Sequence, residues 1–122
     1  MLESLLGSTN CERVLIFIAA REEGYLREIS DFFETSPAPI LKQLEKLENG
    51  GVLFSRLAGR TRLYGFNPRY PFLNELKSLL DKALTFYPED IRARLLESRR
   101  RPRRKGKPEE FERIEALLKR TA

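Results

Sequence analysis

The 122 residues are 41% hydrophobic and 34% charged, which suffices for one compact domain with a core and a highly charged surface. No apolar run approaches the roughly 20 residues that cross a bilayer, and no secretory signal opens the chain, so we expect a cytoplasmic protein without a membrane segment. The formal net charge of +5 comes from residues 92–107, which hold nine basic residues and one acid, whereas residues 1–91 hold 11 basic and 13 acidic residues.

The first elements in chain order are a short apolar lead-in and a helix. Leu2, Leu5 and Leu6 form the lead-in. Thr9 is followed three residues later by Glu12, which is the spacing of a capping box, and apolar residues then recur at helical spacing. We expect this helix to end near residue 23, with Gly24 at the C′ position that favours glycine.

Two further helices follow, joined by a turn of three or four residues around 34–36. The second helix is expected from about residue 25 to Phe33, and the third from Pro37 to Asn49. Ser36 suits the N-cap, and Pro37 suits the first helical position, where its missing N–H costs nothing. In the third helix, the apolar residues expected to face the core are Ile40, Leu44 and Leu47.

The pattern changes from helix to strand after two glycines at 50–51. Residues 52–57 and 61–66 flank a three-residue connection, Ala58 to Arg60, and predict a hairpin. A helix with a broad apolar stripe is expected at 72–87. A short helix at 91–98, a basic run at 99–107 and an amphipathic helix at 108–122 follow.

This order predicts a mainly α fold with a small β-hairpin (α+β), a winged helix-turn-helix with an added C-terminal helix and an extended basic tail. We expect the winged-helix domain over residues 1–87, including the helix at 72–87. Residues 88–107 would form the short helix and a basic linker, and residues 108–122 the last amphipathic helix.

The third helix and the hairpin carry the side chains expected to contact double-stranded DNA. The helix face opposite the apolar one can enter a major groove, and arginines on a protruding hairpin suit phosphates or a narrow minor groove. Residues 42–69 hold six basic residues and two acids. The candidate DNA contacts are Ser36, Ala38, Leu41, Lys42, Gln43, Lys46, Arg56, Arg60 and Arg62. The alternative for the arginines is a solvated strand whose charge discourages aggregation.

Several stretches together resemble the ArsR-like winged-helix transcriptional regulators over roughly residues 5–85. They are residues 25–30, Ser36-Pro37, residues 44–48, Gly51-Val52-Leu53, residues 59–64 and Asn67-Pro68. The resemblance implies that 37–49 is the recognition helix and 54–66 the wing, and that the helix at 73–87 builds a dimer interface with the N-terminal segment. The chain departs from that family at Ser30 for Ala, at Glu34-Thr35 for Gly-Leu, and at Pro37-Ala38-Pro39, where relatives often carry polar side chains.

The apolar stripe of the helix at 72–87 is wider than a small helical core requires, which favours a homodimer. The candidate dimerisation residues are Leu5, Leu6, Leu73, Leu76, Leu80 and Leu84. The alternative is that the stripe packs only within its own chain.

The absence of certain residue types limits the chemistry. There is no histidine, and Cys11 is the one cysteine, so a transition-metal site and His-dependent catalysis lack their groups. No Gly-rich phosphate motif is present either. We therefore predict no metal, no cofactor and no enzymatic activity.

The predicted function is a dimeric DNA-binding transcriptional regulator, and the alternative is a winged-helix module for protein–protein interaction with a C-terminal docking helix. The run at 99–107 would track phosphates or serve as a solvated linker.

Overall fold

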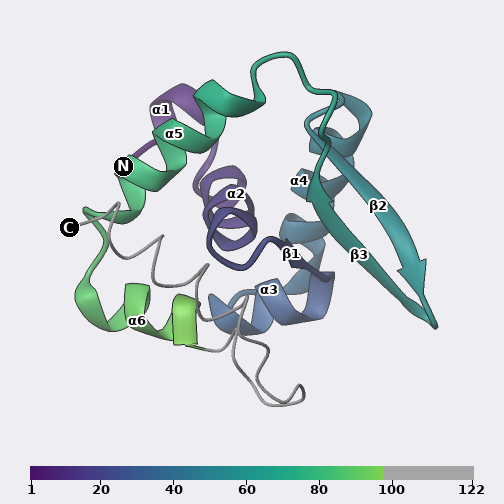
Figure 1. Cartoon of the computed structure of the whole chain (residues 1–122). Coiled ribbons are helices and arrows are strands. Elements are labelled where there is room, and N and C mark those ends of the chain that lie inside the picture. Colours follow the sequence, from purple (N-terminus) through teal and green to yellow (C-terminus); the bar gives the residue numbers. More distant parts are fainter. Residues whose placement is uncertain (98–122) are drawn as a thin grey trace, which may run out of the picture.

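The computed structural model describes residues 1–97, and the expected basic run at 99–107 and helix at 108–122 lie outside this part (Figure 1). The helices are α1 (Glu3–Leu6), α2 (Thr9–Arg21), α3 (Leu26–Phe32), α4 (Pro37–Asn49), α5 (Leu73–Leu84) and α6 (Glu89–Glu97). The strands are β1 (Glu23–Gly24), β2 (Leu53–Ala58) and β3 (Thr61–Phe66). The predicted order of three helices, a hairpin and a further helix is therefore present.

The central element is α2, and the other helices lie around it (Figure 1). Val14, Phe17 and Ile18 are all 0% exposed, as are Leu44 of α4 and Leu80 of α5. A helix that is apolar on nearly every side is stable only when neighbouring elements cover it. The core of the molecule is thus assembled on α2.

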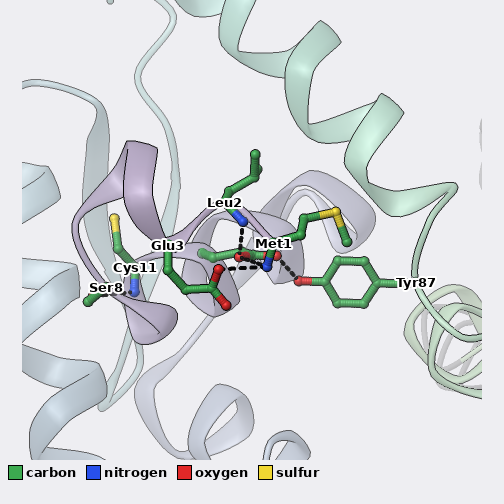
Figure 2. Close-up of polar contacts among 7 residues, drawn as sticks. Met1, Leu2, Glu3, Ser8, Cys11 and Tyr87 are labelled. Carbon is green, nitrogen blue, oxygen red and sulfur yellow. Dashed lines mark hydrogen bonds and ion pairs between the residues drawn. The ribbon is translucent and has the colours of Figure 1, made fainter.

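The N-terminus of α2 differs from the expected capping box at Thr9 and Glu12. The N-cap is Ser8, whose Oγ accepts a hydrogen bond of 3.0 Å from the backbone N–H of Cys11 (Figure 2). Glu12 does not reach back to a cap, and its side chain is buried instead. The prediction was wrong by one residue because serine and threonine are both good caps and stand side by side here.

Glu12 joins three segments of the chain. Its carboxylate accepts hydrogen bonds from the backbone N–H of Leu2 at 2.8 Å, from the Met1 ammonium at 3.2 Å and from the Tyr87 hydroxyl at 2.5 Å, and Figure 2 shows the three donors converging. A buried carboxylate is tolerated only with such partners. Burial, reinforced by the bond to Glu12, raises the pKa of Tyr87.

The C-terminus of α2 also differs from the prediction. Glu22, with φ of 74°, takes the left-handed position that Gly24 was expected to fill, and residues 23–24 form β1 instead. Gly24 is required for space: a Cβ there would lie 2.7 Å from Cε1 of Phe17. A glycine after a helix can serve as a cap or permit a close approach, and here it permits the approach.

The sheet has the order β1-β3-β2, and both pairs are antiparallel. β1 places Gly24 opposite Tyr64, and β2 runs beside β3 from Leu53 opposite Phe66 to Ala58 opposite Thr61. The hairpin base is therefore attached to the α2–α3 connection, and its tip projects away from the helices (Figure 1).

α6 is held against α2 by a buried arginine. Nε of Arg21 donates to the carbonyl of Leu95 at 2.8 Å, and Nη2 donates to the carbonyl of Arg94 at 3.1 Å. The guanidinium also lies 4.5 Å from the ring centre of Phe17. Arg21 therefore donates to two carbonyls of α6 and joins this helix to α2.

Candidate nucleic-acid interface

The pair α3 and α4 is joined by the sharp turn that the sequence suggested. α3 ends at Phe32 and α4 begins at Pro37. Glu34 has φ of 54°, and the N–H of Thr35 donates to the carbonyl of Ser30 at 3.0 Å. The left-handed residue is a glutamate, which is less suited than glycine to this conformation.

The inner face of α4 was predicted correctly. Ile40 and Leu44 are 0% exposed, and Leu47 is 8% exposed. The opposite face is in solvent and carries Ala38 and Lys42. The exposed face also carries Glu45, and it begins at Ser36, the N-cap residue, whose side chain makes no capping bond.

One flank of α4 turns toward the corner between α1 and α2. The Nζ of Lys46 lies 3.8 Å from where a Cβ on Gly7 would be. Burial raises the pKa of the Cys11 thiol, and the nearby charge of Lys46 offsets part of this rise. Gln43 lies on the same flank, and its Oε1 is buried without a hydrogen-bond partner among residues 1–97. Two of the expected DNA contacts are thus at the edge of the exposed face.

The other flank of α4 faces the hairpin. Glu48 accepts a hydrogen bond of 2.8 Å from the Ser55 hydroxyl on β2. Leu41 is half-buried and lies two helical turns before Glu48, on the same side. Burial, followed by the charge of Glu48, raises the pKa of Tyr64 at the hairpin base. The exposed face of α4 therefore continues onto the hairpin surface that carries Ser55.

The hairpin turn has two residues, not the expected three. Ala58 pairs with Thr61, so Gly59 and Arg60 alone form the connection. Gly59 has φ of 67°, as the first central position of a type II′ turn requires. This difference of one residue changes the register of the whole hairpin.

The register places the wing arginines apart, although they were expected together. A three-residue turn would have put Arg56 opposite Arg62, on one face, but Arg56 lies opposite Leu63, and Arg62 lies opposite Leu57. Side chains alternate between the faces of a strand. Arg62 therefore shares the inner face with Ser55, toward α4, and Arg56 lies on the outer face.

The two arginines also have different partners. Nη2 of Arg56 lies 3.1 Å from Oε1 of Glu23 in an exposed ion pair. Nη1 of Arg62 donates to Oγ of Ser55 at 2.8 Å. Arg60 is exposed in the turn itself. The candidate surface thus consists of the outward face of α4 and the inner face and tip of the hairpin.

The candidate dimerisation residues divide into buried and accessible ones. Leu80 is 0% exposed and Leu84 is 1% exposed within a single chain, so neither offers surface to a second copy. Both lie on the side of the α5 stripe that packs within the chain. Leu5 is 67% exposed, and Leu6, Leu73 and Leu76 are half-buried.

Sequence reasoning did not identify Glu48 and Ser55 as parts of this surface, nor Glu23 as the partner of Arg56 on the outer face. Each is an ordinary polar residue in its own segment, and only the hairpin register brings them to the two arginines. A two-residue turn beginning at Gly59 would have been the signal, since glycine is favoured at the first central position of such turns.

Within residues 1–97, no three acidic or thiol side chains are grouped closely enough to hold a metal ion. No helix in that range is long and apolar enough to cross a membrane.

Comparison with known proteins identifies the fold. No protein-family model matches the chain, and none of the curated proteins matches it. A transcriptional regulator of the MarR family from Silicibacter pomeroyi is similar in structure, with a TM-score of 0.53 and 17% identity over 97% of this chain and 73% of that chain. A mutant of ZitR from Lactococcus lactis in apo form has a TM-score of 0.49 and 21% identity over 91% of this chain and 78% of that chain. The first likeness confirms the predicted winged-helix fold, with its mainly helical, α+β composition.

Proposed function

We propose that this winged-helix chain is a DNA-binding transcriptional regulator, with α4 in the major groove and the hairpin on the backbone or in the minor groove. The observation that carries the proposal is the continuous surface from the outward face of α4 to the inner face of the hairpin, joined at the Glu48–Ser55 bond. It carries the three bases Lys42, Arg60 and Arg62 against the two acids Glu45 and Glu48, whereas residues 1–91 as a whole have more acids than bases. A local positive surface on an acidic body favours one orientation on DNA.

The similar structure is described as a transcriptional regulator, which agrees with this proposal. The ArsR-like assignment rests on the sequence resemblance and stays a prediction. The alternative of a protein-interaction module depends on a docking helix at 108–122, which lies outside the described residues.

We infer further that the chain works as a homodimer. Exposed apolar side chains lie on α1 and around both ends of α5, with Leu5 at 67%, Phe72 at 61% and Phe86 at 68% exposure. A two-fold dimer through these helices would present two copies of α4 to successive major-groove segments about one helical turn apart.

The DNA test uses the intact chain and a fluorescein-labelled duplex of mixed sequence, about 30 base pairs long to hold two half-sites. Anisotropy should show binding at about 50 mM salt that weakens steeply as salt rises. Replacing Lys42 and Arg62 by Ala should weaken binding, whereas the charge-matched pair Lys77→Ala and Lys82→Ala on α5 should have little effect. Absence of binding at low salt, or equal loss in both variants, would refute the proposed surface.

Selection from a randomised duplex library then tests sequence preference, which we expect to change with Lys42→Ala and not with Arg60→Ala. For the dimer, light scattering should give twice the chain mass for the wild type. Leu5→Glu with Phe86→Glu should give the monomer mass, and Leu57→Glu on the hairpin, which is 60% exposed, is the matched control that should remain dimeric. A monomeric wild type at working concentration would contradict this interface.

A further inference from the structure

We propose that Ser55 and Glu48 are positioning residues that hold Arg62 ready to bind a DNA phosphate, and that Arg56 is not part of the DNA surface. The inference rests on the proposed function, and it identifies which hairpin arginine binds the DNA backbone and which residues orient that arginine. Its basis is a chain of two hydrogen bonds, from Arg62 to Ser55 and from Ser55 to Glu48, each 2.8 Å long.

The direction of these bonds is determined by the donors and acceptors present. Glu48 as a carboxylate can only accept, so the Ser55 hydroxyl donates its one hydrogen to it. A lone pair of the same oxygen is then left for Nη1 of Arg62. Glu48 is thereby linked to the guanidinium without a direct ion pair, and the hydroxyl orientation that suits Arg62 is the one that Glu48 imposes.

Arg62 keeps most of its binding capacity in this arrangement. A guanidinium has five N–H donors, and among the described residues Arg62 uses one of them, for Ser55. The side chain is exposed beside Leu57, its cross-strand neighbour on the inner face. Fork-shaped donors that remain available next to the α4 surface suit a phosphate oxygen pair.

Arg56 is in the opposite situation. Its guanidinium lies within 3.1 Å and 3.5 Å of the two carboxylate oxygens of Glu23, on the outer face. A phosphate approaching Arg56 would meet the negative charge of Glu23 at the same time. Glu23 thus neutralises Arg56 by direct contact, whereas Glu48 reaches Arg62 only through the Ser55 hydroxyl, so Arg62 is the more available of the two arginines.

Prior positioning affects affinity because an arginine must lose its rotamer freedom when it binds. Immobilising such a side chain weakens an interface by about two- to tenfold. If Ser55 has already restricted Arg62, removing the hydroxyl should weaken binding by about that factor. The same removal should have no effect once Arg62 is absent.

The experiment is a double-mutant cycle on the full chain, with anisotropy of the same mixed-sequence duplex. Arg62→Ala should weaken binding and reduce the slope of log affinity against log salt by about 0.9 per subunit, as expected for one lost phosphate contact. Ser55→Ala should weaken binding about two- to tenfold, Ser55→Thr should restore it because threonine keeps the hydroxyl and suits a strand, and Ser55→Ala should add nothing to Arg62→Ala. Arg56→Ala is the matched control and should leave the salt slope unchanged.

The outcomes separate this inference from the proposed function. The positioning role would be overturned if the wild type binds and Ser55→Ala weakens DNA binding equally in the wild type and in Arg62→Ala, with unchanged thermal stability. Wild-type binding with equal losses for Arg56→Ala and Arg62→Ala would overturn the distinction between the faces. A wild type that does not bind the duplex at low salt would overturn the proposed function and this inference with it.

Discussion

Replacing Gly24 by alanine should destabilise the protein although the backbone conformation there allows any residue. The new Cβ would lie 2.7 Å from Cε1 and 3.0 Å from Cδ1 of Phe17, and 3.4 Å from Cδ1 of Ile29. Phe17 and Ile29 are both 0% exposed. The Phe17 ring is also enclosed by Arg21, at 4.5 Å, and by the Phe32 ring, at 5.8 Å between centres. The Phe17 ring therefore has little space to move away from the added Cβ.

The size of the effect follows from two opposing contributions. Adding a methyl group to a packed core costs about 1–3 kcal/mol, and Gly→Ala recovers about 0.4–1 kcal/mol by restricting the unfolded chain. A contact of 2.7 Å puts the cost in the upper part of its range, so the net loss should be about 1–2.6 kcal/mol. Each kcal/mol lowers the Tm of a domain of this size by about 4–8 °C. Thermal unfolding followed by circular dichroism measures it.

Two controls make the result specific to the contact. Gly65→Ala lies in the same sheet, where the nearest atom to a Cβ is 3.4 Å away, and should change stability by less than about 0.5 kcal/mol. Phe17→Leu removes the ring edge, so Gly24→Ala should cost less in that background. An unchanged Tm for Gly24→Ala, or an equal cost in both backgrounds, would refute the steric explanation.

Three further predictions concern stability. Glu34→Gly should raise the Tm, because a non-glycine residue at φ of 54° costs about 1–2 kcal/mol, and Asp31→Gly inside α3 is the control that should lower it. Arg21→Met should reduce the unfolding free energy by about 1–3 kcal/mol and so lower the urea midpoint, because two carbonyls of α6 lose a donor. An unchanged midpoint would contradict that role. The raised pKa of Tyr87 means that the folded state favours the neutral phenol, so the unfolding free energy should fall as pH rises above about 10, where the unfolded tyrosine ionises, by up to about 1.4 kcal/mol per pH unit. Tyr87→Phe should make this fall shallower in urea titrations at successive pH values, and an unaltered slope would count against it.

The elements with strong local signals could be predicted from sequence. The bounds of α4 match because Pro37 can only begin a helix and two glycines follow Asn49, with apolar residues at helical spacing between them. β1 could not be predicted, because two residues carry no periodicity and their partners in β3 lie about 40 residues away in the sequence. Gly24 shows the same limit, since its role depends on Phe17, seven residues earlier on a different element.

The candidate site was predictable in its location and less so in its detail. Exposure of Ala38 and Lys42 follows from helical spacing alone. The separation of Arg56 from Arg62 depends on one residue of turn length, and the burial of Leu80 and Leu84 depends on how closely α5 lies on α2. These are properties of packing and register, which local patterns do not determine.

The alternation of faces along the hairpin also limits how its length can change in evolution or by engineering. Consider one residue inserted into each strand, between the hairpin base and these side chains. Arg62 and Leu57 would then move to the outer face, and Arg56 would move to the face toward α4. Inserting two residues into each strand would extend the hairpin by about 6.6–6.8 Å and leave every face assignment intact. The hairpin can therefore gain reach only in even steps, whereas an odd step would put Arg56 in place of Arg62 on the face toward α4.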